Sequence, residues 1–187
     1  MPVKGDLGLR VGPFKGAALS VQLSYAAAND WLMPAMADGQ LLFGYRNLRA
    51  WKAGVHASWS FRKCVLLDAG FETSLGDGEK DCWIEWRDRA RHVVSASLRV
   101  TPIPALSVDL SYELRMKRRM AVADGTRGFV ETSLCDVNNL NAGASYRVTD
   151  AFTVFARAEN LLGKTHYIMP FVPEQGFTGL VGVGLKF

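Results

Sequence analysis

Several features that define common classes of protein are missing from this 187-residue chain. No run of 18 apolar residues occurs, which excludes a membrane-spanning helix. The three cysteines, Cys64, Cys82 and Cys135, lack Cys-x-x-Cys spacing, and there is no glycine-rich phosphate loop, catalytic triad or pair of catalytic acids. The net charge of +4 comes from arginines spread along the chain, which is a poor basis for nucleic-acid binding. The sequence therefore predicts no catalytic residue, no metal site, no cofactor and no enzymatic activity.

The N-terminus also lacks a recognisable export signal. Residues 1–6 contain Pro2, Lys4 and Asp6, without an apolar core or a cleavage site. We therefore expect no signal peptide in this chain. Either the chain stays inside the cell, or it belongs to a longer precursor whose signal lies upstream.

What the chain does have is an alternation of apolar and polar residues with a period of two, which is the signature of β-strands with one apolar face. The opposite face is rich in Ser, Gly and charged residues, as the lumen side of a membrane barrel is. This pattern predicts about nine strands, at residues 6–11, 19–25, 51–61, 67–75, 94–100, 107–117, 141–148, 152–159 and 177–187.

The connections between these strands alternate in length. Short turns are expected at residues 12–16, 61–64, 101–105 and 148–150, and longer links at 31–40, 76–88, 121–136 and 163–176. Membrane barrels have short periplasmic turns and long outer loops. Counting back from a last strand that ends in the periplasm puts every short turn on that side. The sequence thus predicts an all-β fold, an antiparallel up-and-down transmembrane barrel segment.

The final strand carries a more specific signal. Phe187, Leu185, Val183 and Val181 alternate with smaller or polar residues up to the last position of the chain. This ending resembles the C-terminal signature of bacterial outer-membrane β-barrels, which the barrel-assembly machinery reads. The resemblance implies that the cell outer membrane is the location and that its lipid and lipopolysaccharide are partners.

A second motif narrows the family. Asn160-Leu161 is followed by Tyr167, a proline-containing loop, Gly176 and the terminal strand. Over about the last forty residues the chain resembles the end of a TonB-dependent outer-membrane receptor. Such receptors are 22-stranded barrels filled by a plug domain. The resemblance implies uptake of a scarce nutrient such as an iron chelate, with energy passed on by TonB.

The chain departs from that family in size, since it has no plug, no energy-coupling box and fewer than half the strands. We therefore interpret residues 1–187 as one unit, the C-terminal portion of a receptor barrel. Two alternatives stay open. One is a small stand-alone outer-membrane barrel with a structural or adhesion role. The other is a soluble lipocalin-like barrel that binds an apolar ligand.

Six basic residues form the main candidate ligand-binding site. If Thr101 faces Ala105 across the intervening turn, they lie in facing pairs on the lumen side, near the outer end: Arg91 with Arg115, Arg89 with Lys117, and Arg87 with Arg119. Like charges that face each other destabilise a strand pair, so acids are expected nearby; Glu72 reaches the row in one register. Two interpretations remain: compensation by neighbouring acids, or an anion-attracting wall for an acidic or metal-chelate substrate. Arg118 is expected to point outward, where lipid phosphates are available to it.

The remaining candidates are weaker. Trp31, Trp83, Trp86, His166 and Tyr167 are expected at strand ends or in outer loops, where aromatic side chains form interfacial girdles more often than ligand contacts. His56 is expected alone on the lumen side, and His92 at a strand start without a partner at metal spacing. Cys82 and Cys135 both fall in predicted outer loops, so a disulfide between them is one option and free thiols the other.

Overall fold

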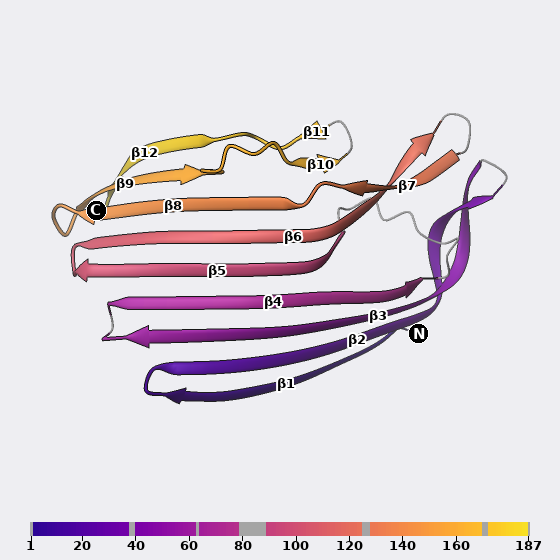
Figure 1. The fold of residues 1–187 in the computed structure, drawn as a ribbon, viewed down its shortest axis with the longest axis horizontal. Coiled ribbons are helices and arrows are strands. Elements are labelled where there is room, and N and C mark those ends of the chain that lie inside the picture. Colours follow the sequence, from indigo (N-terminus) through magenta and orange to yellow (C-terminus); the bar gives the residue numbers. More distant parts are fainter. Residues whose placement is uncertain are drawn as a thin grey trace.

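The protein, seen in a computed structural model, consists of β-strands joined by turns and loops (Figure 1). The structure describes residues 2–37, 40–62, 64–78, 89–124, 128–169 and 172–186. None of their segments is a helix able to cross a membrane. The strands are β1 (Pro2–Phe14), β2 (Ala17–Ala37), β3 (Gln40–Phe61), β4 (Val65–Gly78), β5 (Arg89–Ile103), β6 (Leu106–Asp124), β7 (Gly128–Leu134), β8 (Val137–Arg147), β9 (Phe152–Glu159), β10 (Tyr167–Met169), β11 (Val172–Pro173) and β12 (Thr178–Leu185).

Ten of these strands form one antiparallel sheet. Its order is β1-β2-β3-β4-β5-β6-β8-β9-β12, and β7 pairs with the outer part of β6. The nine strands of the main path confirm the nine predicted from alternation. The short β7 and the separate hairpin β10–β11 were not predicted, because both lie in segments whose Gly, Pro and Asp content is typical of loops.

The register of the sheet separates two faces across its whole width. Successive residues of a strand point to opposite sides, and directly paired residues share a side. One rung on the polar face passes through Arg10, Ser20, His56, Gly70, Ser95, Glu113 and Asn139. The adjacent rung on the apolar face passes through Val11, Leu19, Ala57, Ala69, Ala96, Tyr112 and Leu140. The predicted alternation is therefore confirmed strand by strand.

The short turns lie where the sequence predicts them. They join β1 to β2, β3 to β4, β5 to β6 and β8 to β9, all at one end of the sheet (Figure 1). The turn between β1 and β2 consists of Lys15 and Gly16, which have φ of 49° and 85°. A Cβ on Gly16 would collide with the backbone carbonyl of Ser60, whose amide donates a 2.8 Å hydrogen bond to the Gly16 carbonyl. Glycine is therefore required there by both conformation and space.

At the opposite, outer end the strands run further than predicted. The segment 31–40, expected as a loop, continues β2 and β3 as a paired hairpin up to Ala37 and Gln40. A register shift between Ala28 and Trp31 absorbs one extra residue in β2. Pro34 and the glycines indicated a loop, but a two-stranded ribbon beyond the sheet tolerates proline because its outer edges need no partner. Residues 38–39 and 79–88, also predicted as loop, lie outside the described residues.

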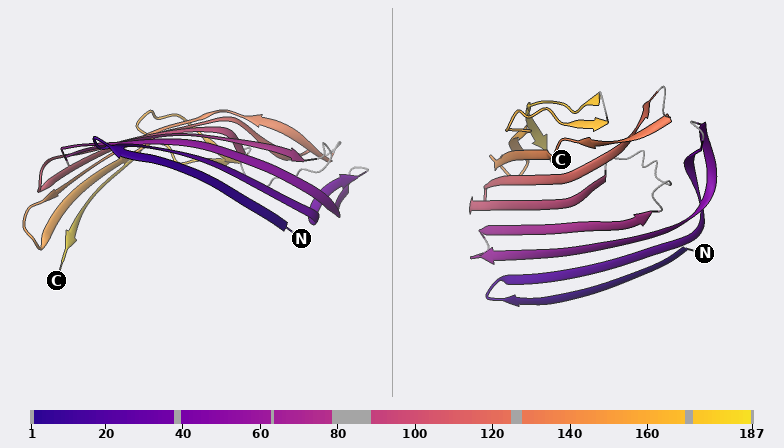
Figure 2. Two further views of the ribbon diagram at one scale, coloured as in Figure 1. Left: turned by 90° about the horizontal axis from the view of Figure 1, so that it is seen from below. Right: turned by 45° about the vertical axis from the view of Figure 1, so that its right-hand side comes forward.

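The sheet is twisted and curved, and it is open at both sides. β1 and β12 form its two margins, at opposite sides of the view in Figure 1, and Figure 2 shows the curvature from two other directions. The polar backbone groups on the free side of each margin thus have no strand partner within the described sheet.

Candidate functional site: the polar face and the outer basic segment

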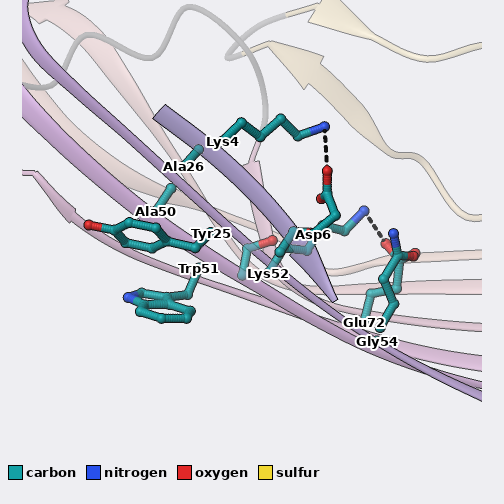
Figure 3. Close-up of a pocket in the computed structure, with 12 residues that line it drawn as sticks. Lys4, Asp6, Tyr25, Ala26, Ala50, Trp51, Lys52, Gly54 and Glu72 are labelled. Atoms are coloured by element: carbon teal, nitrogen blue, oxygen red, sulfur yellow. Dashed lines mark ion pairs between the residues drawn. The ribbon is translucent and has the colours of Figure 1, made fainter. Parts of the chain in front are cut away.

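The polar face near β1 carries a set of ion pairs. The Lys4 ammonium lies 3.3 Å from the Asp6 carboxylate, and the Lys52 ammonium lies 2.7 Å from that of Glu72. These charges surround a hollow of about 390 Å³ between β1 and β4 (Figure 3). Tyr25 and Trp51 lie on the other side of the same strands, with their ring centroids 4.4 Å apart. The two ammonium groups and the two carboxylates around the hollow balance each other, so the hollow is not a site of one net charge.

Glu72 does not serve the predicted basic row. It pairs in register with Val93 of β5, and its carboxylate contacts Lys52 and, at 3.5 Å, Nε2 of His56. Glu72 thus shares a rung with Arg115 of the row, two strands away, while its carboxylate is bound to Lys52 and His56. His56 is likewise not alone, because besides contacting Glu72 its ring lies above Gly70, where an added Cβ would come within 2.6 Å of Nδ1.

A second hollow, of about 290 Å³, lies near the middle of the polar face. Small residues of adjacent strands make its floor, among them Gly70, Ser95, Ser97 and Ser111. Asp68, Glu113, Asn139 and Asn141 surround this floor. The hollow thus offers mainly hydrogen-bond acceptors and hydroxyl groups, on the same face as the ion pairs.

The register of the basic row differs from the prediction by two residues. Arg89 pairs with Arg119 instead of Lys117, and Arg115 pairs with Val93 instead of Arg91. The reason lies in the turn, since Ile103 pairs with Leu106 across Pro104 and Ala105, and a register shift follows between Val100 and Ile103. A three-residue loop was expected where the chain uses two.

The charges of the row are also more dispersed than predicted. The guanidinium of Arg115 forms a 2.8 Å ion pair with Glu113, two residues earlier in β6. Arg91 and Lys117 are exposed. Arg87 lies outside the described residues, and of Arg89 and Arg119 the structure describes the backbone. The backbone pairing of Arg89 with Arg119 keeps two of the six bases opposite each other at the outer end.

Arg118 is the clearest correction at residue level. It does not reach outward to lipid but is only 2% exposed. Its Nη1 donates to the carbonyl of Cys135 at 2.9 Å, and its Nη2 to that of Tyr167 at 2.5 Å. The sequence showed only another arginine in a basic stretch, so neither its burial nor its partners had a local signal.

The histidines and cysteines have structural surroundings. Nδ1 of His92 lies 2.9 Å from the hydroxyl of Thr73, and its ring stacks on Phe71. His166, predicted in an interfacial girdle, is instead 4% exposed, with Nε2 3.1 Å from the carbonyl of Asn138. Cys64 and Cys135 are free thiols, and Cys82, Trp83 and Trp86 lie outside the described residues. Within the described part of the chain, no three acidic, histidine or cysteine side chains converge as a metal centre.

The sequence motif at Asn160 marks a hydrogen-bonded loop start. Asn160 has φ of 50°, its amide donates to Oδ1 of Asn141 at 2.9 Å, and its Nδ2 donates to the Lys164 carbonyl at 2.9 Å. It is 5% exposed. Asparagine tolerates this left-handed conformation and closes the loop on itself, which explains why asparagine ends β9.

The last strand is held in the sheet along its whole length. β12 pairs with β9 from Thr178 opposite Glu159 to Leu185 opposite Phe152. Phe155 lies over Gly182, so that a Cβ there would come within 2.5 Å of the ring. Val181, Val183 and Leu185 are exposed on the apolar face, and Phe187 lies outside the described residues. The assembly signal that these four residues are predicted to form stays a prediction.

Aromatic residues mark two levels of the apolar face. Tyr25 and Trp51 pair about halfway along β2 and β3, and Trp59 and Phe61, with ring centroids 5.5 Å apart, lie near the short turns. The ten steps along β3 from Trp51 to Phe61 span about 33 Å, or about 25 Å along the membrane normal at a tilt of about 40°. That height equals the apolar band of an outer-membrane barrel.

This sheet has the fold of part of the barrel of TonB-dependent outer-membrane receptors, the class that the sequence predicted. The FrpB iron transporter from Neisseria meningitidis matches the whole chain with a TM-score of 0.80 and 13% identity, over 31% of its own length. The copper transporter OprC matches the whole chain with a TM-score of 0.77 and 18% identity, over 31% of its own length. The pyoverdine receptor FpvA from Pseudomonas aeruginosa matches the whole chain with a TM-score of 0.78 and 11% identity, over 30% of its own length. The chain thus spans about 30% of the length of these neighbours. No family model and no curated protein matches the sequence.

Proposed function

We propose that residues 1–187 form the C-terminal portion of the barrel wall of a TonB-dependent outer-membrane receptor that takes up a scarce nutrient such as an iron chelate. One observation supports this more than any other. Nine consecutive strands separate an apolar from a polar face throughout, and this sheet matches receptor barrels over the full chain. A wall that faces lipid on one side and a water-filled or plugged lumen on the other requires that separation.

The same geometry supports the proposed location and partners. The apolar face, with its two aromatic levels, fits outer-membrane lipid and lipopolysaccharide, and the terminal strand fits recognition by the barrel-assembly machinery. Both hollows are bordered by charged and polar side chains of the opposite face, which suits contact with a plug domain inside the barrel. TonB would act on that plug and not on the wall. These residues then have a transport role within the complete barrel and no catalytic one.

The ligand-binding part of the proposal concerns the outer basic segment, Arg87, Arg89, Arg91, Arg115, Lys117 and Arg119. Its support is the cross-strand pairing of Arg89 with Arg119 and the exposure of Arg91 and Lys117. Like charges brought together in a lined cavity raise the local concentration of anions. An iron chelate of acidic groups has the matching charge, and FrpB and FpvA are named for iron and pyoverdine.

The stand-alone barrel and the lipocalin-like barrel have less support. Either would need its first and last strands to meet, whereas β1 and β12 lie at the two margins of the described sheet (Figure 1). A soluble barrel would also place the polar face outside. The continuous apolar rungs and their aromatic levels would then line the interior at the height of a membrane, which a small soluble cavity does not require.

The first experiment is to read the genomic frame upstream of Met1. We expect an open frame that encodes further alternating strands, a plug and a signal peptide. A stop codon and a promoter close to Met1 would contradict the receptor proposal and favour a small independent barrel.

The second experiment tests transport. The complete gene product is expected in the outer-membrane fraction, and its deletion should abolish growth on one or more ferric chelates as the iron source. Outer-membrane location without any nutrient phenotype across chelates of iron and other metals would contradict the transport role and leave the barrel fold intact.

A further inference from the structure

One buried cation joins two outer segments that are distant in sequence. Arg118 donates one hydrogen bond to Cys135, in the joint between β7 and β8, and another to Tyr167, at the start of β10. Both acceptors are backbone carbonyls, so the contacts fix chain segments rather than side chains. A guanidinium suits this position because its donors have fixed directions and reach two carbonyls at once.

Arg118 lies at a bend of the wall. Lys117, the preceding residue, has φ of 53°, and its amide donates to Oδ1 of Asp136 at 3.1 Å. At the same level β6 changes its partner, from Val137 of β8 opposite Arg115 to Leu134 of β7 opposite Arg118. The direction of the β6–β7 hairpin is therefore set at the point where Arg118 binds. Figure 1 shows this hairpin turning away from the line of the sheet.

The second segment is the loop that carries β10 and β11, and it is attached at two points. Besides the Tyr167 carbonyl on Arg118, His166 contacts the Asn138 carbonyl of β8 at 3.1 Å. The His166 carbonyl in turn accepts a 2.7 Å hydrogen bond from the amide of Glu174. This loop is thus a folded unit held against β6 and β8.

We propose that Arg118 is a positioning residue that couples the β6–β7 hairpin to the loop carrying β10 and β11, so that the two outer segments keep one common orientation. Loss of the guanidinium removes the two hydrogen bonds, each part-buried, that hold the Cys135 and Tyr167 carbonyls to β6, which favours opening of both segments together. The coupling depends on these hydrogen bonds and not on what the barrel transports, so it stands or falls separately from the proposed function.

The test compares Arg118→Gln with Arg115→Gln in the complete gene product, folded in detergent, by hydrogen exchange and mass spectrometry. Arg115 is the matched control, since it lies on the same strand but is exposed and bound to Glu113. For Arg118→Gln we expect exchange to rise about tenfold or more in both residues 118–136 and residues 166–174, with β9 and β12 unchanged. Arg115→Gln should leave both segments as they are. A rise in one segment only, or in neither, would overturn the coupling.

A second variant keeps the proposal testable should Arg118→Gln not assemble. His166→Leu removes the side-chain donor of the loop's other attachment and leaves Arg118 in place. Coupling predicts faster exchange in residues 166–174 together with a smaller increase in 118–136. An increase confined to 160–174 would show that the segments open independently and would overturn the proposal.

Discussion

At the scale of single residues, two glycines with left-handed backbone differ in whether there is space for a Cβ atom. Gly16 and Gly163 both have left-handed φ, of 85° and 60°. Only Gly16 has a backbone carbonyl in the path of a Cβ, and Gly163 has no atom within 4 Å. Substitution of Gly163 therefore measures the cost of the left-handed backbone alone, and substitution of Gly16 measures that cost together with the cost of a steric collision.

We predict that Gly163→Ala lowers the free energy of unfolding by about 1 kcal/mol, the cost of left-handed backbone in alanine. Gly16→Ala should cost about 1–3 kcal/mol more, because the turn must shift to clear Ser60. Urea unfolding of the complete barrel in lipid vesicles measures both. Gly5→Ala, where φ is ordinary and the surroundings are open, is the control and should change little. Equal losses for Gly16 and Gly163 would show that the collision is relieved at no cost.

Residue-level prediction from the sequence succeeded where alternation decides and failed where distant contacts decide. The face of each strand residue followed from its parity, so the polar and apolar sets were predictable. Arg118 and His166 were misplaced, and the partners of Glu72 were missed, because the contacts of these three residues come from segments 16 to 49 residues away in the chain. No local pattern marks a carbonyl that will need a donor.

At the scale of elements, the two faces of one strand should respond oppositely to charge. Val21 and Gln22 are neighbours in β2, and they pair with Val55 on the apolar face and Gly54 on the polar face. Val21→Arg should lower the free energy of unfolding in lipid by about 2–4 kcal/mol, the cost of arginine near the bilayer midplane. Gln22→Arg should have little effect, because it projects to the polar side, where Glu72 lies opposite Gly54. Equal effects in vesicles would contradict the assignment of the lipid-facing side.

The last strand has its own prediction. Phe187→Ser removes the terminal aromatic residue and leaves the sequence of β12 unchanged, and we expect slower assembly by the reconstituted barrel-assembly machinery, seen as delayed heat-modifiable migration. Lys186→Ser is the control, as its position alternates to the opposite face. Identical assembly rates for the two variants would remove Phe187 from the assembly signal.

Element boundaries also show why part of the fold was not predictable. The pairing of β5 with β6 was misjudged by two residues, although both strands were located. Two prolines, Pro102 and Pro104, mark the turn, but they do not say whether two or three residues form the loop. The register is set by the pairing of Ile103 with Leu106 and the shift beyond it, which are properties of the formed hairpin.

At the scale of the whole molecule, the open sheet limits what these residues can do alone. The free sides of β1 and β12 expose rows of backbone donors and acceptors that lipid cannot satisfy. Residues 1–187 expressed by themselves should therefore misassemble or aggregate, and size-exclusion chromatography in detergent should show no discrete folded monomer. A heat-modifiable monomer in that experiment would contradict this expectation and support the stand-alone barrel.

The register shift in β2 constrains how this wall can vary in length. Before it, Tyr25 pairs with Trp51; after it, even-numbered Leu32, Pro34 and Met36 pair with Tyr45, Phe43 and Leu41. Because β2 has one additional residue at the shift, its apolar residues beyond the shift, now at even-numbered positions, still pair with odd-numbered residues of β3. A deletion of one residue between Ala28 and Trp31 would remove the shift and keep every pairing beyond it, whereas a deletion of two would need a new shift in β3 or exchange the two sides of everything beyond it. Among descendants of this gene, gaps of one residue at that point should therefore be tolerated, and gaps of two should be rare there.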